Sequence, residues 1–243
     1  RDTFFYGVAD FFTAMLAWAL FFVYRKGFEG AHPGAGVFSD PKFFLGVLII
    51  PIGWVLLYSI FDHYVDIYRL SRLTTLTRTF FLSFIGVIFL FFALILDDVV
   101  IDYQTYYRSF LTLFGLHFLL TATVRMIVLT WASRRLKAGL ITFNTLIVGG
   151  DQNALDLYLD IKGRKKGLGN KFIGYIDTNG GNGQALGEHL TRLGKIDHLA
   201  HIIREHEIEE VIVAIETSEH NRLRDILNVL FDFGDQVLVK IIP

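Results

Sequence analysis

Four runs of about twenty apolar residues dominate the first half of this sequence and constrain its fold more than any other feature. They cover Phe4 to Tyr24, Phe43 to Phe61, Thr79 to Leu96 and Phe110 to Trp131. A helix of that length crosses the roughly 30 Å hydrocarbon core of a bilayer, and its backbone satisfies its own polar groups there. We therefore predict a polytopic membrane protein with four transmembrane helices.

The composition changes sharply after the fourth apolar run. Of the 37 aromatic residues in the chain, 31 precede residue 132, and charged residues are denser beyond it. We predict a four-helix transmembrane domain over residues 1–131, a basic linker over 132–143 and a soluble domain over 144–243. The formal net charge of −1 argues against a nucleic-acid partner, which requires a strongly basic face. The lipid bilayer is the first partner that the sequence predicts.

The distribution of Lys and Arg in the short connections predicts the orientation of the four helices. One side of the membrane receives Arg1, Arg69, Arg72, Arg78, Arg134, Arg135 and Lys137. The other side receives Arg25, Lys26, Lys42 and Arg108. Because cytoplasmic connections carry the excess of basic residues, we expect both ends of the chain and the soluble domain in the cytoplasm.

Asp10 and Arg125 lie inside the first and fourth apolar runs. Charged groups are costly in hydrocarbon and usually have a partner. In the orientation above, both residues lie ~10 Å below the cytoplasmic surface, so we predict an intramembrane ion pair. Two alternatives stay open at this point: separate positions, with Arg125 extending toward the interface, or a proton or ion relay.

The connection between the second and third runs, Asp62 to Arg78, carries three membrane-interface candidates, Arg69, Arg72 and Arg78. Its apolar and basic residues alternate, as in a helix that lies against anionic headgroups. The alternative is an ordinary basic loop on the cytoplasmic side.

The second half alternates strand-like and helix-like segments, which predicts an α/β Rossmann-like domain with a parallel sheet. Predicted strands cover Asn144 to Val148, Lys171 to Ile176, Glu210 to Ile215 and Gln236 to Ile242. Predicted helices cover Asn153 to Lys162, Asp197 to His206 and Ser218 to Phe233.

The turn after the first predicted strand holds the candidate nucleotide-binding residues, Gly149, Gly150 and Asp151. A Rossmann phosphate loop needs a second glycine where this chain has Asp151, and a carboxylate there faces an anionic phosphate. Asp177 follows the second strand and is a candidate ribose ligand. The pattern favours a degenerate Rossmann module, with tight dinucleotide binding and an unidentified nucleotide effector as alternatives.

The sequence contains no recognisable catalytic or metal-binding motif. With no cysteine, it lacks thiolate nucleophiles and thiolate zinc sites. His198, His201 and His206 lie on one predicted helix without a completing ligand set, so we predict a solvated face. We expect no catalytic residue, no metal ligand and no bound cofactor in this chain.

Several motifs resemble the N-terminal region of bacterial polyprenyl glycosylphosphotransferases, which initiate exopolysaccharide synthesis. They are Asp66 to Leu73 (DIYRLSRL), Phe91 to Asp98 (FFALILDD), Asn144 to Gly150 (NTLIVGG), Ile208 to Ile215 (IEEVIVAI) and Val239 to Pro243 (VKIIP). Together with the four apolar runs, the resemblance covers the whole chain.

The resemblance implies a membrane-anchoring and dimerisation or regulatory region of an enzyme in the bacterial inner membrane. In that family a separate catalytic domain follows the position of Pro243. It transfers a sugar 1-phosphate from a nucleotide sugar to a polyprenyl phosphate, with an Asp–Glu pair and Mg²⁺. We therefore expect a homodimer that is inactive as this chain alone.

Other protein classes share this order of parts. A membrane-bound nucleotide-sugar dehydratase or epimerase has four spans and a similar module, followed by a second NAD-binding domain. A membrane-anchored nucleotide sensor and a subunit of a gated transporter are further alternatives.

Overall fold

The computed structural model of the chain describes residues 2–28, 38, 40–61, 64, 66–95, 103–164, 169–178, 184–215 and 220–241. They belong to two compact units, Arg1–Ser133 and Arg134–Pro243. The first unit is helical, and the second is an α/β domain with five parallel strands. The predicted fold class is confirmed.

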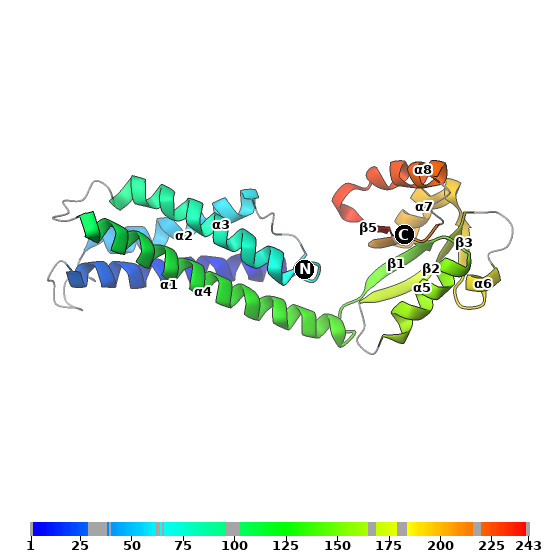
Figure 1. Cartoon of the computed structure of the whole chain (residues 1–243), viewed down its shortest axis with the longest axis horizontal. Helices are drawn as coiled ribbons and strands as arrows, with labels where there is room; N and C mark the ends of the chain where they lie inside the picture. Colours follow the sequence, from blue (N-terminus) through cyan, green and yellow to red (C-terminus); the bar gives the residue numbers. More distant parts are fainter. Residues whose placement is uncertain are drawn as a thin grey trace. The chain divides into compact units, whose positions relative to one another are not determined.

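The first unit is built from four long apolar helices (Figure 1). They are α1 (Thr3–Phe28), α2 (Pro41–Phe61), α3 (Arg72–Leu90), which continues into the π-helical turn η1 (Phe91–Ile95), and α4 (Tyr103–Lys137). Each contains a stretch long and apolar enough to cross a bilayer, and these stretches are Thr3–Gly27, Pro41–Phe61, Arg72–Ala93 and Tyr106–Lys137. The chain is therefore a membrane protein with four candidate membrane spans.

Two of these helices extend beyond the predicted runs. The helix α3 begins at Arg72 rather than Thr79, and α4 continues to Lys137, so residues 132–137 of the predicted linker are helical. The end of α4 is set by Gly139, which has a φ of +72°. Gly139 donates to the Leu136 carbonyl at 3.0 Å and Leu140 donates to the Arg135 carbonyl at 3.1 Å, which is the Schellman arrangement.

Glycines let aromatic rings pack between the membrane helices. A Cβ on Gly46 of α2 would lie 2.2 Å from the Trp18 indole nitrogen of α1. A Cβ on Gly86 of α3 would lie 2.4 Å from the ring of Trp54 of α2. Since lipid tails are as apolar as the side chains, close packing of this kind is a main source of association between membrane helices.

The α/β unit contains five strands and four helices among its described residues. In chain order these are β1 (Phe143–Val148), α5 (Gln152–Gly163), β2 (Asn170–Asp177), α6 (Gln184–Gly187), β3 (Arg192–Lys195), α7 (Leu199–Glu205), β4 (Glu210–Val213), α8 (His220–Phe231) and β5 (Leu238–Ile241). The strands pair in parallel in the order β3-β2-β1-β4-β5. This is the order of the first five strands of a Rossmann fold.

Helices cover both faces of the central strand, as Figure 1 shows. Leu146 and Val148 of β1 belong to a core that includes residues of α7 and α8. Ile147, between them in sequence, belongs to a second core with Ala154 and Tyr158 of α5. Because alternate residues of a strand point to opposite faces, the run of apolar residues in β1 supplies both cores.

The structure adds two elements that the sequence pattern did not predict, α6 and β3. The strand β3 has the sequence Arg-Leu-Gly-Lys and lies at the edge of the sheet, where little of it is buried. The predicted strand from Gln236 begins at Leu238, because Gly234–Gln236 forms a 3₁₀ turn. The predicted helix from Ser218 is described from His220 onward, and its first two residues lie outside the described residues.

We expect Gly86→Ala to destabilise the helical unit, because the added methyl group must displace the buried ring of Trp54. Overpacking of this kind costs about 1–3 kcal/mol. The measurement is unfolding of the whole chain in detergent, monitored by tryptophan fluorescence. Gly115→Ala is the matched control, since nothing lies within 4 Å of its Cβ position. Equal stability of the two variants would contradict the packing role of Gly86.

Candidate functional site

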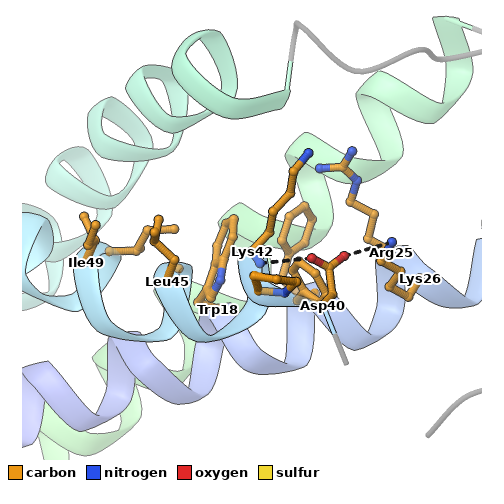
Figure 2. Close-up of a pocket in the computed structure, with 12 residues that line it drawn as sticks. Trp18, Arg25, Lys26, Asp40, Lys42, Leu45 and Ile49 are labelled. Carbon is orange, nitrogen blue, oxygen red and sulfur yellow. Dashed lines mark hydrogen bonds and ion pairs between the residues drawn. The ribbon is translucent and has the colours of Figure 1, made fainter. Parts of the chain in front are cut away.

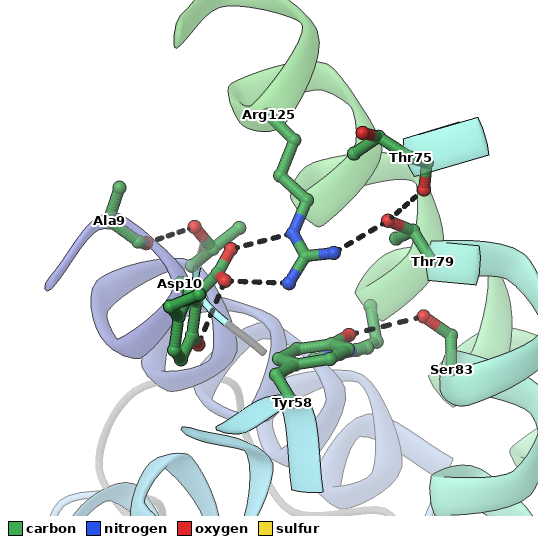
Figure 3. A network of polar contacts seen from close by, with 10 residues as sticks. Ala9, Asp10, Tyr58, Thr75, Thr79, Ser83 and Arg125 are labelled. Carbon is green, nitrogen blue, oxygen red and sulfur yellow. Dashed lines mark hydrogen bonds and ion pairs between the residues drawn. The ribbon is translucent and has the colours of Figure 1, made fainter. Parts of the chain in front are cut away.

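An ion pair between α1 and α4 is buried inside the helical unit (Figure 3). The Arg125 Nε donates to Asp10 Oδ1 at 3.0 Å, and Arg125 Nη2 donates to Asp10 Oδ2 at 2.7 Å. Each side chain is 1% exposed. The two parallel hydrogen bonds match the planar guanidinium to the carboxylate, which is the strongest geometry for such a pair.

The other two membrane helices complete the surroundings of Arg125. From α3, the Thr79 hydroxyl accepts from Arg125 Nη1 at 2.8 Å and donates to the Thr75 carbonyl at 2.7 Å. From α2, the ring of Tyr58 lies with its centroid 4.2 Å from the Arg125 Cζ. An aromatic face attracts a cation at this distance. The guanidinium of Arg125 on α4 therefore contacts side chains from each of the other three helices.

A second set of buried polar side chains continues from Tyr58. Its hydroxyl lies 2.9 Å from His117 Nε2 and 3.4 Å from Ser83 Oγ. The His117 ring stacks on Trp54 with 3.6 Å between the ring centroids. Tyr64, outside the spans, donates to Asp10 Oδ2 at 3.0 Å, and burial together with this carboxylate raises the pKa of the Tyr64 hydroxyl. Tyr64 therefore remains a hydrogen-bond donor at neutral pH.

The structure thus brings together the two charged residues that the sequence marked inside the apolar runs. The alternative in which Asp10 and Arg125 lie apart is wrong, because the two side chains form a buried, bidentate pair. The sequence could not reveal Thr79, Tyr58 and His117 as partners, since isolated Thr, Tyr and His residues in apolar runs are unremarkable. We interpret the network as an internal clamp that holds the four helices in one arrangement.

We expect Asp10→Asn to cost about 3–5 kcal/mol of stability, because it leaves a buried guanidinium without a counter-charge. The double variant Asp10→Asn, Arg125→Gln should cost about 2 kcal/mol less than the sum of the two single variants. Unfolding of the whole chain in mixed micelles measures these differences. Arg72→Gln, at an exposed position, is the control. Additive effects of Asp10→Asn and Arg125→Gln would refute the clamp.

The three predicted membrane-interface arginines lie around the start of α3. Arg69 lies in a turn in which its backbone N–H donates to the Asp66 carbonyl at 3.0 Å. Arg72 and Arg78 lie in the first two turns of α3 with exposed side chains. Ile67 is 2% exposed and packs with residues of α1 and α4. An interfacial helix is therefore wrong for residues 66–71, which form a turn that packs against α1 and α4.

In the α/β unit, Gly149 lies where β1, β2 and β4 end together. Its φ is +136°, and a Cβ there would lie 2.1 Å from the Ala214 carbonyl oxygen. Its N–H donates to the Ile176 carbonyl at 2.9 Å. Only glycine fits this close contact between two backbone segments. Gly149 and Gly150 are both buried, so the first glycine serves the sheet as the Rossmann pattern requires.

Asp151 caps α5. Its side chain accepts a hydrogen bond from the Ala154 backbone N–H at 3.2 Å. A helix N-terminus attracts anions, and here the chain's own carboxylate takes that position. Asp177 ends β2 with 3% exposure, and its Oδ2 lies 3.1 Å from Arg192 Nη2. The structure places all four candidate nucleotide-binding residues at the carboxyl ends of β1 and β2, the edge where nucleotides bind in such folds.

These residues do not fit a pyrophosphate at the start of α5. A phosphate there would meet the Asp151 carboxylate, and the hydrogen bond from Ala154 is already made to that carboxylate. The Asp177 carboxylate is neutralised by Arg192. Described residues of this unit contain no group of three His, Cys, Asp or Glu side chains that could hold a metal ion. His201 pairs with Glu205 at 3.3 Å on an exposed helix face.

A buried acid that the sequence pattern did not single out lies at the other end of the sheet. Glu210, the first residue of β4, is 3% exposed. Its Oε1 accepts from Lys240 of β5 and from Asn170 of β2, both at 2.7 Å. Asn170 also donates to the Thr145 hydroxyl of β1 at 3.1 Å. This ladder of hydrogen bonds joins four parallel strands. A Glu as the first residue of an otherwise apolar strand is the sequence signal that could have found it.

We expect Asp151→Asn to raise the affinity of the chain for adenine nucleotides, because asparagine keeps the helix cap while the repelling charge is removed. Isothermal titration of the whole chain in detergent with NAD, ADP and other ADP-containing nucleotides measures this. Asp156→Asn, on the exposed face of α5, is the control. Nanomolar binding of any of these nucleotides by the unaltered chain would contradict the role given to Asp151.

Comparison with known proteins gives one family match. Residues 59–243 match a family model described as a CoA-binding domain. The match begins within α2 and includes α3, α4 and the whole α/β unit. No curated protein matches the chain.

Two solved structures are similar at low levels. One is the crystal structure of RSP, a Rex-family repressor, and the other is RSP in complex with β-NADH. Each is 14% identical over 72% of this chain and 88% of the other chain, with TM-scores of 0.35 and 0.34. Similarity at this level has no bearing on the function of this chain.

Proposed function

We propose, from the premise that this chain belongs to the CoA-binding domain family, that it anchors and regulates a polyprenyl-phosphate sugar-1-phosphate transferase. The observation that carries the proposal is the extent of the family match. It covers two membrane helices together with the complete α/β unit, so the family combines a membrane anchor with this module. Such domains are found in sugar-transferase-type proteins.

The geometry of the resembling motifs supports the proposal. In the first motif, Asp66 accepts from the Tyr68 backbone N–H at 3.1 Å, and Ile67 packs against the helices. In the strand-and-turn motif, Gly149 allows the close approach of the chain after β1 to the Ala214 backbone that follows β4. These residues shape the path of the chain at the helix ends and at the sheet edge, which suits a scaffold rather than a reaction centre.

In this proposal the protein lies in the bacterial inner membrane with the α/β unit in the cytoplasm. A catalytic domain, contributed by further chain, binds a nucleotide sugar and Mg²⁺ beside the inner leaflet. It joins the sugar 1-phosphate to the phosphate of a polyprenyl phosphate and releases a nucleoside monophosphate. The present chain holds that domain at the leaflet and dimerises through its own units.

A membrane-anchored nucleotide sensor is the second candidate, and the description of the family as a CoA-binding domain favours it. The Asp151 carboxylate at the start of α5 weighs against it, because it repels the phosphates that such a ligand carries. The titration of the Asp151 variant described above distinguishes this candidate from a scaffold.

The full gene product that contains this chain should transfer sugar 1-phosphate in membrane preparations. We expect a radiolabelled uridine diphosphate sugar and undecaprenyl phosphate to yield a lipid-linked diphosphate sugar and uridine monophosphate in the presence of Mg²⁺. Residues 1–243 expressed alone should give no product and serve as the matched control.

Two results would contradict the proposal. A water-soluble dehydrated or epimerised nucleotide sugar would identify a membrane-bound dehydratase or epimerase instead. No lipid-linked product with any sugar of a broad panel, from a protein that is folded and inserted, would rule out sugar-phosphate transfer.

A further inference from the structure

A cavity of about 580 Å³ lies between the end of α1 and the start of α2 (Figure 2). Charged and apolar residues line it, among them Trp18, Arg25, Lys42, Leu45, Gly46 and Ile49. It is on the far side of the helical unit from the Asp10–Arg125 pair along α1, fifteen residues or about 22 Å from Asp10 to Arg25. The cavity is therefore separate from the polar network around Arg125.

The mouth of the cavity is positively charged. Arg25, Lys26 and Lys42 line it together with one acid, Asp40. The Lys42 backbone N–H donates to Asp40 Oδ1 at 2.9 Å, and Lys26 Nζ lies 3.3 Å from Oδ2. The hydrogen bond from Lys42 and the Lys26 ammonium hold the pKa of the Asp40 carboxyl below its usual value, so it stays ionised. Among the described residues that line the mouth, three cations and one carboxylate give a formal charge of +2.

The inner wall of the cavity is apolar and continues onto the outer surface of the helical unit. Leu45 and Ile49 of α2 are 62% and 54% exposed on the surface of the helical unit. A second hollow shares Pro41, Leu45 and Ile49 with the cavity and continues over Phe44 and Leu48. From Pro41 to Ile49 this apolar path extends ~12 Å along α2. Its dimensions and chemistry suit a hydrocarbon chain.

One buried donor in the cavity wall has no acceptor among the described residues, the indole N–H of Trp18. The Trp18 side chain is 7% exposed, and Figure 2 shows its ring between Leu45 and Lys42. Its nitrogen lies against Gly46, one helical turn or ~6 Å deeper along α2 than Lys42. A donor without an acceptor in a membrane interior costs free energy, so an acceptor at the depth of Gly46 would stabilise the indole N–H.

We propose that this cavity binds an anionic glycerophospholipid. The phosphate lies against Arg25 and Lys42, and an ester carbonyl below it accepts a hydrogen bond from the Trp18 indole. One acyl chain lies along Leu45 and Ile49. A glycerophospholipid carries an anion, ester oxygens and a hydrocarbon chain in this order from the membrane surface inward, and the cavity presents their partners in the same order. The assignment does not depend on the proposed enzyme activity.

The test measures lipids bound to the purified whole chain by native mass spectrometry, with phosphatidylglycerol and phosphatidylcholine supplied in equal amounts. We expect a preference for phosphatidylglycerol that falls about fivefold for each cation removed in Arg25→Gln and Lys42→Gln. Arg108→Gln is the matched control, because Arg108 is an exposed cation at the start of α4 and does not line the cavity. An unchanged preference in the Arg25→Gln, Lys42→Gln double variant would overturn the proposal.

A second variant tests the indole contact separately. Trp18→Phe keeps an aromatic ring but removes the donor, so binding of both lipids should weaken about two- to tenfold while the preference for phosphatidylglycerol remains. Gly46→Ala should also weaken binding, because its methyl group pushes the indole from its place. Gly53→Ala on the same helix has nothing within 4 Å and should bind as the unaltered chain does. Full binding by Trp18→Phe would overturn the ester contact.

Discussion

A guanidinium inside a hydrocarbon layer must be matched by a carboxylate, and this requirement organises the helical unit. Asp10 supplies the charge from α1, while Thr79 and Tyr58 bring α3 and α2 to the same group. Such a pair is weak evidence of net stability, since an apolar replacement can be as stable. Its contribution is specificity, because any other register of the four helices leaves a charge without its partner.

Close packing of aromatic rings on glycine complements this polar centre. Trp18 lies on Gly46 and Trp54 lies on Gly86, so α1, α2 and α3 approach one another where a larger residue would hold them apart. Trp54 also stacks on His117 of α4. The same packing that buries Trp18 leaves its N–H at the wall of a cationic cavity, which makes the packing of α1 on α2 part of a lipid site.

The α/β unit has the topology of a nucleotide-binding fold, but the position where such folds bind a phosphate carries a negative charge, that of Asp151. Gly149 allows the close backbone contact where β1, β2 and β4 end, whereas Asp151 caps α5 with its own carboxylate. The Glu210 ladder and the Asp177–Arg192 pair place further polar groups where they stabilise the sheet. This combination is consistent with the scaffold role proposed above, in a family that is described by a ligand.

The sequence by itself determined the two units, the four apolar helices and the parallel sheet, because hydrophobic length and periodicity are local properties of the chain. It also marked Asp10, Arg125, Gly149 and Asp151, since charge in an apolar run and glycine after a strand are visible without coordinates. It missed β3, whose four residues are polar or small and owe their conformation to pairing with β2. Only the tertiary structure decided which groups meet: Thr79 and Arg125 are 46 residues apart, and Trp18 and Gly46 lie on different helices. Contacts of this kind depend on how helices pack, and packing is a property of surfaces rather than of sequence spacing.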